Sequence, residues 1–305
     1  MLNVLFIAND TSSEIHKMYH YLEQELARSV KLTIWRKPGH MDYILSQLPT
    51  KPDFILLLND IGKHMRPLIK GLSRTSIPVG LFVNDVHRFV ELRRNYITKH
   101  RIEHLFTVTR EKFIELYPDF INKMEWFPHF IHTEIYRDYG LKKDINLLMM
   151  GAVNEIYPLR QQIIKTYDRN LDFVYHKHPG YREFSKQEED RHFIGKSYAK
   201  ELNRAKIVFT CPSVFCYPVI KYFEVLACKS LLLAPTFPEL EDLGFVPNYH
   251  FVPINEQNFQ EKASHYLENE AERQQIAEQG YQFIRQKHSL KARTKSLVNR
   301  IECII

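Results

Sequence analysis

Short apolar runs that alternate with helical patterns are the feature that most constrains the fold of this chain. Each run is almost continuously apolar, which is typical of strands that are buried on both faces of a sheet. Amphipathic stretches lie between the runs, as βαβ units require. The first half therefore predicts a parallel α/β sheet covered by helices. We expect strands at residues 4–8, 30–35, 54–58, 79–83 and 104–108, and helices that include residues 14–28 and 66–73.

The pattern restarts after residue 145 and predicts a second α/β unit. A polar stretch at residues 137–144 separates the two units, so we expect domains at 1–140 and 141–288. Pro158 is suited to the first position of a helix, and helical patterns dominate from Phe259 onward. Ligands of open α/β sheets bind beyond the carboxyl ends of the strands, so two such units predict a cleft between them. The expected strands of this unit lie at residues 146–150, 171–175, 207–210 and 231–234.

Charge, cysteine content and hydropathy limit the compartment and the partners. The 305 residues carry 42 Lys and Arg against 36 Asp and Glu, a net charge of +6. This excess permits an anionic partner but demands none, and we expect no stable nucleic-acid partner. The four cysteines form no CxxC pair or zinc-ribbon spacing, which indicates reduced thiols. Residues 2–8 are followed by no cleavage site, and no run reaches the roughly 18 apolar residues of a membrane span. We therefore expect a soluble cytoplasmic protein.

Several common enzyme motifs are missing from the sequence. None of the 10 glycines forms a dinucleotide-binding G-x-G-x-x-G or a P-loop. There is no Asp-x-Asp to carry a divalent metal and no serine nucleophile elbow. His16 and His20 are four residues apart, and His176 and His178 form a short pair, but neither pair has a third ligand at a metal-site spacing. We expect neither a bound metal nor a cofactor.

Residues 211–235 carry the most informative pattern of the second unit. An uncharged loop follows a strand, and Pro218 can start the next helix. Lys221 and Glu224 are three residues apart on this helix, near its N-terminus. Lys221 and the helix N-terminus are suited to a diphosphate, and Glu224 is suited to a ribose diol. The alternative is an ordinary exposed ion pair.

The second half resembles the C-terminal half of GT-B glycosyltransferases, in particular the spore-maturation CgeB-like and glycosyl transferases group 1 families. The similarity rests on residues 218–235, on Pro238 to Glu241, and on the helices at 273–280 and 288–293. It implies two Rossmann-like domains that face a cleft, with the C-terminal helix 289–305 packing back on the N-terminal domain. By this resemblance Glu224 binds the donor ribose. Gly151, Tyr157 and Arg160 match the first strand–helix turn of the donor domain, where Arg160 either reaches phosphate or is a surface arginine.

Two positions depart from the pattern of the family. Many relatives that retain the configuration of the sugar carry two glutamates eight positions apart, and the first falls on Cys216 in this chain. A cysteine is a poor hydrogen-bond acceptor, so the stereochemical outcome stays open. The glycine that follows Ala-Cys in the family is Lys229, which affects the end of the helix.

The N-terminal unit is expected to carry the acceptor site. Asp85 and His87 follow a buried strand at its carboxyl end, and either can deprotonate an acceptor hydroxyl. Asp85 is our first candidate base and His87 the second; the alternative is that Asp85 caps a helix that begins near Arg88. Asn9 and Asp10 are weaker candidates. Residues 88–101 form a basic helix with aromatics, either a solvated face or a peripheral contact with a membrane.

Together these features predict a metal-independent glycosyltransferase. By the resemblance, its donor is a UDP- or GDP-sugar, and its acceptor is a glycan, a lipid, a protein or a modified DNA base. A nucleotide-sugar epimerase can share the fold and needs no acceptor. The alternative from another class is a non-catalytic two-domain protein that binds a sugar or a nucleotide.

Overall fold

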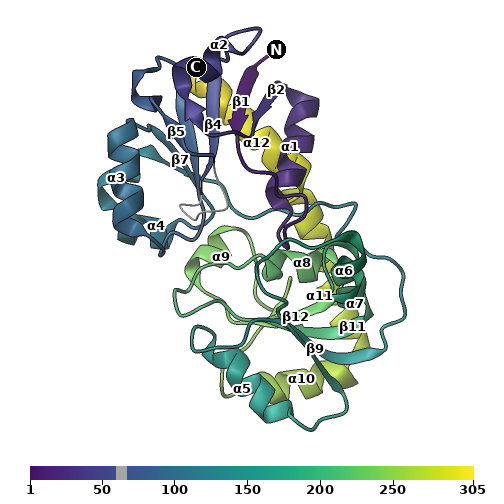
Figure 1. The fold of residues 1–305 in the computed structure, drawn as a ribbon. Helices are drawn as coiled ribbons and strands as arrows, with labels where there is room; N and C mark the ends of the chain where they lie inside the picture. The colour runs from purple at the N-terminus through teal and green to yellow at the C-terminus, as the bar shows by residue number, and fades with distance from the viewer. Residues whose placement is uncertain (60–66) are drawn as a thin grey trace. The chain divides into compact units, whose positions relative to one another are not determined.

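The computed structural model describes residues 1–59 and 67–305, which form two compact units (Figure 1). The first unit comprises Met1–Ser12, Tyr19–Pro128 and Arg293–Ile305, and the second comprises Ser13–Met18 and His129–Ala292. Each unit is built on its own parallel sheet, which confirms the predicted α/β class.

The first unit is centred on a sheet of six parallel strands in the order β2-β1-β4-β6-β7-β8. Leu5, Ile55 and Leu81 occupy one face of this sheet and belong to one apolar core. In Figure 1, α3 and α4 lie toward one side of the sheet, and α1 and α12 toward the other. The elements are β1 (Asn3–Ile7), α1 (Met18–Ser29), β2 (Lys31–Trp35), β3 (Gly39–His40), α2 (Met41–Ser46), β4 (Phe54–Asn59), β5 (Ile69–Lys70), η1 (Leu72–Arg74), β6 (Val79–Val83), α3 (Val90–His100), β7 (His104–Thr107), α4 (Glu111–Leu116), η2 (Pro118–Lys123), β8 (Met124–Trp126) and α12 (Leu290–Ile304).

The second unit is centred on five parallel strands in the order β10-β9-β11-β12-β13. Successive residues of β9 point to opposite faces, so Leu148 and Met150 join one core and Leu147 and Met149 another. The first core includes α7, α8 and α11, and the second includes α5 and α10. The elements are β9 (Ile145–Gly151), α5 (Pro158–Tyr167), β10 (Phe173–Lys177), α6 (Lys186–Arg191), α7 (Lys196–Arg204), β11 (Ala205–Phe209), α8 (Lys221–Ala227), β12 (Leu231–Ala234), α9 (Pro238–Asp242), β13 (Val252–Pro253), α10 (Phe259–Glu268) and α11 (Glu270–Lys287).

Every strand expected from the sequence is present, with ends that differ by at most two residues, whereas three helices differ. Residues 67–73 form β5 and part of η1 rather than a helix, and Arg66 lies outside the described residues. The helix expected at 14–28 begins only at Met18, and residues 14–17 are part of a loop that belongs to the second unit. The helix expected from Pro218 begins at Lys221. Pro158 opens α5, as predicted.

The division into units differs from the domain ends expected from the sequence. The chain enters the second unit at His129 rather than near residue 141. Ile131 packs in the core of the second unit, and Asn203 accepts a hydrogen bond from the Tyr139 backbone at 2.8 Å, so the polar stretch is held within that unit. The first unit takes up the chain again from Arg293, early in α12.

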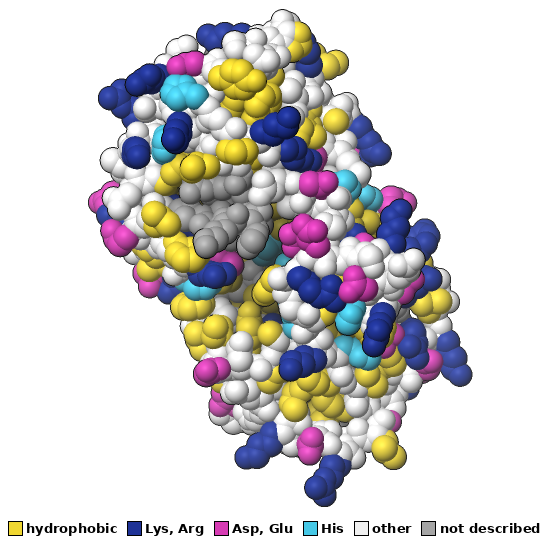
Figure 2. Space-filling model, in the orientation of Figure 1, with side chains coloured by type: hydrophobic (Ala, Val, Ile, Leu, Met, Phe, Trp, Pro, Cys, Tyr) yellow, Lys and Arg dark blue, Asp and Glu magenta, His cyan; other side chains and the backbone are white. Residues whose placement is uncertain are grey.

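The surface carries both signs of charge. On the face seen in Figure 2, Lys and Arg side chains are interspersed with Asp and Glu rather than gathered in one patch. None of the helices that the structure describes is long and apolar enough to cross a membrane.

Candidate functional site

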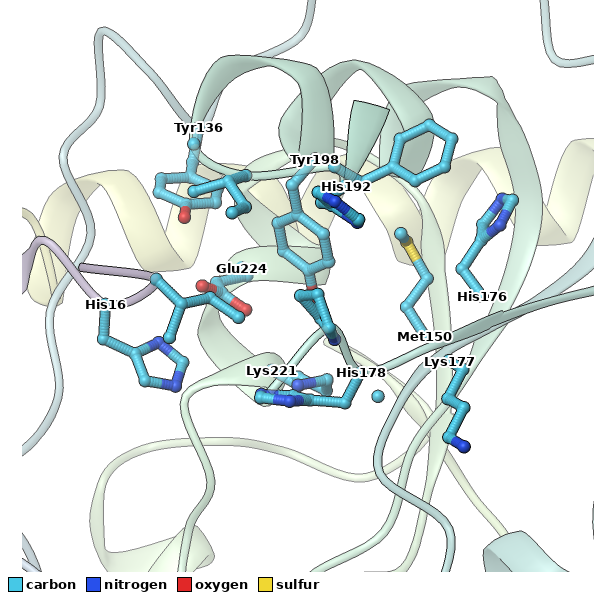
Figure 3. A pocket seen from close by; sticks show the side chains of 16 residues that line it. His16, Tyr136, Met150, His176, Lys177, His178, His192, Tyr198, Lys221 and Glu224 are labelled. Carbon is cyan, nitrogen blue, oxygen red and sulfur yellow. The ribbon is translucent and has the colours of Figure 1, made fainter. Parts of the chain in front are cut away.

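The second unit contains a pocket beside the carboxyl ends of β9 and β10 (Figure 3). This is the edge of a parallel sheet at which ligands are expected. Residues that line the pocket come from β9, β10, α7, α8 and four loop segments, at residues 15–16, 136, 178–179 and 192–195. The lining includes His16, Tyr136, Gly151, His176, His178, Tyr198, Lys221 and Glu224.

Gly151 ends β9 and gives space to two cationic side chains. A Cβ atom at this position would lie 3.0 Å from Lys221 Cε and 3.4 Å from Arg160 Nη1. The φ angle of Gly151 is +131°, which side chains rarely tolerate. Glycine therefore lets Lys221 lie close to the backbone at the pocket wall.

Arg160 is buried behind this wall rather than exposed at the surface. It is 3% exposed and does not line the pocket. Its guanidinium donates to the carbonyl of Ala152 at 3.1 Å, to Thr210 Oγ1 at 3.2 Å and to the carbonyl of Cys211 at 2.9 Å. The guanidinium also lies 3.9 Å from the ring centre of Tyr157. The surface-arginine alternative is therefore wrong: Arg160 ties the loop after β9 to the end of β11, with Tyr157 covering it.

Lys221 and Glu224 both line the pocket, and the exposed ion pair suggested by their spacing is wrong. Glu224 is only 4% exposed, because α8 packs both its apolar face and this side chain inward. Lys221 is half-buried, and the described residues offer its ammonium group no ion-pair or hydrogen-bond partner. Burial, with the positive charge of Arg160, lowers the pKa of Lys221 to about 8.

The Glu224 carboxylate lies among polar groups within the pocket. Burial raises its pKa, against the opposing effects of Lys221 and of the nearby Tyr198 and Tyr136 hydroxyls. The Tyr198 hydroxyl is itself buried and makes no hydrogen bond of normal geometry within the described residues. A ligand that hydrogen-bonds to Tyr198 beside Glu224 would satisfy this hydroxyl.

The sequence suggests His176 and His178 only as a metal pair, yet both line the pocket. His176 contacts Glu201 Oε1 through Nε2 at 2.8 Å, and its ring packs 4.3 Å from that of Phe193. His178 accepts the backbone N–H of Gly180 at Nδ1, at 3.0 Å. Burial, followed by the charges of Lys221 and Arg160, lowers the pKa of His178 to about 4. The signal that could have found these two histidines is their position directly at the end of a strand.

A loop from early in the chain completes the pocket. Residues Ser13–Met18 follow β1 in sequence, and His16 from this loop is exposed and lines the pocket. Lys17 forms an ion pair with Glu189, and the Phe184 backbone donates to the carbonyl of Ser13 at 2.8 Å. These contacts hold the loop on the second unit. Within residues 1–59 and 67–305, His, Cys, Asp and Glu form no group of three or more that could hold a metal ion.

Asp85 and His87, the candidate bases, lie in the first unit just beyond β6. Asp85 does not cap the following helix, because α3 begins at Val90 and its N-cap is Phe89, which has a φ of +53°. The Asp85 side chain is 46% exposed, and its Oδ2 lies 3.8 Å from Arg88 Nη1. The cap alternative is thus wrong, and the proposed role as a base stays a prediction. His87 is half-buried.

Asp10 and the expected basic helix also lie in the first unit. Ser12 donates its backbone N–H to Asp10 Oδ1 at 2.8 Å, and this bond, with the Ser12 side chain, lowers the pKa of Asp10. The expected basic helix is not uniformly solvated, because Arg93 is fully buried and donates to the Tyr117 hydroxyl at 2.6 Å. Leu92 on the same helix is exposed.

Comparisons with known proteins find one family model that matches part of the chain and several solved structures with a similar fold. Residues 158–299 match the family model described as glycosyl transferase-like. A search of curated protein sequences finds no significant match. The fold is similar to HepE of Anabaena in complex with UDP-glucose, with a TM-score of 0.69, 9% identity, and coverage of 99% of this chain and 100% of HepE.

Two other solved structures share the fold over nearly their whole length. Sucrose-phosphate synthase from Thermosynechococcus elongatus gives a TM-score of 0.67 at 9% identity and covers 100% of this chain and 99% of its own. MnaA of S. aureus, in a co-structure with UDP, gives 0.53 at 13% identity, with coverage of 100% and 97%. The fold is GT-B, as predicted, and the narrower CgeB-like resemblance stays a prediction.

Proposed function

From the glycosyl transferase-like domain at residues 158–299 and the GT-B fold, we infer that this chain is a glycosyltransferase, and we propose that its donor is a UDP-sugar. The observation that carries the proposal is a half-buried lysine without a partner, Lys221, in the same pocket as the buried carboxylate of Glu224. The choice of UDP is supported by HepE and MnaA, which were solved with UDP-glucose or UDP.

The pocket supplies a group for each polar part of a nucleotide. Lys221 is the cation for the diphosphate, because an uncompensated buried ammonium gains most from an anion. Glu224 accepts hydrogen bonds from the two ribose hydroxyls. Gly151 leaves space for the Lys221 side chain beside the backbone and so keeps the proposed phosphate ligand at the pocket wall. With Lys221 neutralising the charge of the leaving group, the proposed transfer needs no metal ion or other cofactor.

The acceptor side of the proposal rests on the first unit. Asp85 follows a buried strand, and its half-exposed carboxylate is open to a substrate hydroxyl. It would remove the proton from the attacking hydroxyl, with His87 as the second candidate. A glycan, a lipid, a protein and a modified DNA base remain the acceptor classes of the proposal. We place the enzyme in the cytoplasm, with α3 as its contact with a membrane surface.

The test is binding of UDP, GDP, dTDP and CMP by calorimetry, with Mg²⁺ or with EDTA. We expect UDP to bind with or without Mg²⁺. Glu224→Ala should weaken the binding of UDP about 100-fold, because two hydrogen bonds to a charged group are lost. The matched control is Glu261→Gln, which replaces an exposed carboxylate on α10, far along the chain from Glu224. It should leave the affinity for UDP unchanged. Absence of UDP binding by the folded wild type would overturn the donor assignment, and UDP binding that needs Mg²⁺ would overturn the metal independence.

A further inference from the structure

His178 is held in one tautomer by the turn that follows it. The backbone N–H of Gly180 donates to His178 Nδ1 at 3.0 Å. An imidazole nitrogen that accepts a hydrogen bond carries no proton, so the proton of the neutral ring lies on Nε2. Protonation of Nδ1 would place two N–H groups against each other. The turn therefore opposes the imidazolium form.

Gly180 can aim its N–H at the ring because it is a glycine. Its φ is +93°, in the region that residues with side chains rarely adopt. A Cβ atom there would meet nothing within 4 Å. Replacement by alanine therefore strains the backbone without creating a steric clash, and it offers a way to disturb the hydrogen bond alone.

His178 lines the pocket beside Lys221 (Figure 3), and the described residues give its Nε2 atom no hydrogen-bond partner. The Lys221 ammonium and the neutral His178 ring are thus two neighbouring groups of the pocket that can donate hydrogen bonds to a ligand. Glu224 is the only carboxylate that lines it among the described residues. The other titratable groups around it are His16, Tyr136, His176, Lys177, His192 and Tyr198, with Arg160 behind the wall.

We propose that His178, as a neutral imidazole, donates its Nε2–H to the diphosphate of the nucleotide-sugar donor beside Lys221. This inference rests on the proposed function and adds a second diphosphate ligand with a fixed protonation state. The low pKa of His178, about 4, agrees with a ring that stays neutral at physiological pH. A neutral hydrogen-bond donor orients the phosphates without adding a second positive charge to the site. A second positive charge would hold the nucleoside diphosphate in the site after transfer.

The first experiment compares UDP with uridine, which lacks the phosphates. His178→Ala should weaken UDP about 10- to 100-fold, the loss expected for one hydrogen bond to a charged group, and leave uridine unchanged. His178→Gln keeps an N–H donor and should recover most of the UDP affinity. The control is His265→Ala: His265 lies on α10 and forms an exposed pair with Glu272 on α11. Equal weakening of UDP and uridine, or no effect of His178→Ala on UDP, would overturn the inference while leaving the function intact.

The second experiment reads the protonation state directly. In ¹⁵N-histidine spectra with UDP bound, we expect His178 to remain the neutral Nε2–H tautomer at pH 6. Gly180→Ala should raise the pKa of His178, so that the dependence of UDP binding on the charge of His178 begins at a higher pH in this variant than in the wild type. An imidazolium at His178 in the wild-type complex would contradict the proposal. Failure of the wild type to bind UDP at all would instead refute the proposed function.

Discussion

Lys221 should make donor binding sensitive to alkaline pH. Its pKa in the unoccupied pocket is lowered to about 8, by burial and by Arg160, and a bound diphosphate would raise it again. The ammonium form binds the anion, so UDP affinity is complete below about pH 7 and falls as pH rises through 8. We expect a loss of about tenfold per pH unit between pH 8.5 and 9.5, because one proton is linked to binding. Calorimetric titration of UDP across this range measures the slope.

The matched variant for this slope is Lys221→Met, which keeps the length of the side chain without the charge. This variant should bind UDP weakly at every pH, and its affinity for UDP should no longer fall between pH 8.5 and 9.5. When the wild type and Lys221→Met are compared at the same pH, the titration of UDP itself affects both affinities equally. A wild-type slope that persists in Lys221→Met would assign the effect to another group.

Individual residues of the site differ in how far the sequence can predict them. Lys221 and Glu224 share a helix, so their spacing alone predicts that they lie on neighbouring faces. His178 and Tyr198 come from a loop and from α7, and no local pattern says that they meet Glu224. Burial of Arg160 depends on the carbonyl groups of Ala152 and Cys211, and the second of these lies 51 residues away along the chain.

Among the elements, strands are easier to predict than helix ends. Strands such as β6 are buried along their whole length, so their apolar runs coincide with the elements. The helix after β1 begins later than its pattern suggests, because residues 13–18 are held by contacts such as that of Lys17 with Glu189. Tertiary contacts of this kind leave no periodic signal in the sequence.

The end of α8 shows how an unfavourable backbone conformation is compensated. Lys229 has a φ of +56°, where relatives are expected to carry glycine, and its ammonium lies 3.3 Å from Asp138 Oδ2 and 2.8 Å from Glu278 Oε2. Lys229→Gly removes the strain and both ion pairs, so we expect a change in unfolding free energy below about 1 kcal/mol. Lys229→Ala keeps the strain and loses the ion pairs, so it should be about 1 kcal/mol less stable than Lys229→Gly. Urea unfolding gives this order.

Salt and pH separate the two effects of Lys229 on stability, which are the strain of its backbone and its ion pairs. The Lys229 ammonium lowers the pKa of Glu278, so the pair stabilises the fold above about pH 4.5 and loses its effect as pH falls further. In 1 M salt the ion pairs are screened, and Lys229→Gly should become at least as stable as the wild type. If Lys229→Ala equals Lys229→Gly in stability, the strain argument is wrong.

At the scale of the molecule, three apolar cores of the described residues each lie within one unit. The core that contains Leu81 lies wholly in the first unit, and the two cores that flank β9 lie wholly in the second. The restart of the strand pattern in the sequence predicts two units. It does not predict that Ser13–Met18 belongs to the second unit, since that loop lies between elements of the first.

Because the donor pocket is built within the second unit alone, UDP should stabilise that unit selectively. At 100 times its dissociation constant, a ligand adds about 2.7 kcal/mol to the stability of the state that binds it. We expect native-state hydrogen exchange of buried amides in β9, such as Leu148, to slow about 100-fold with saturating UDP. The amide of Leu81 in β6 should exchange at an unchanged rate, because local and unit-level opening of the first unit does not release UDP. Glu224→Ala provides the control, since UDP should protect neither strand at the same concentration. Equal slowing in β6 and β9 would show instead that the two units open as one cooperative structure, with the donor stabilising both.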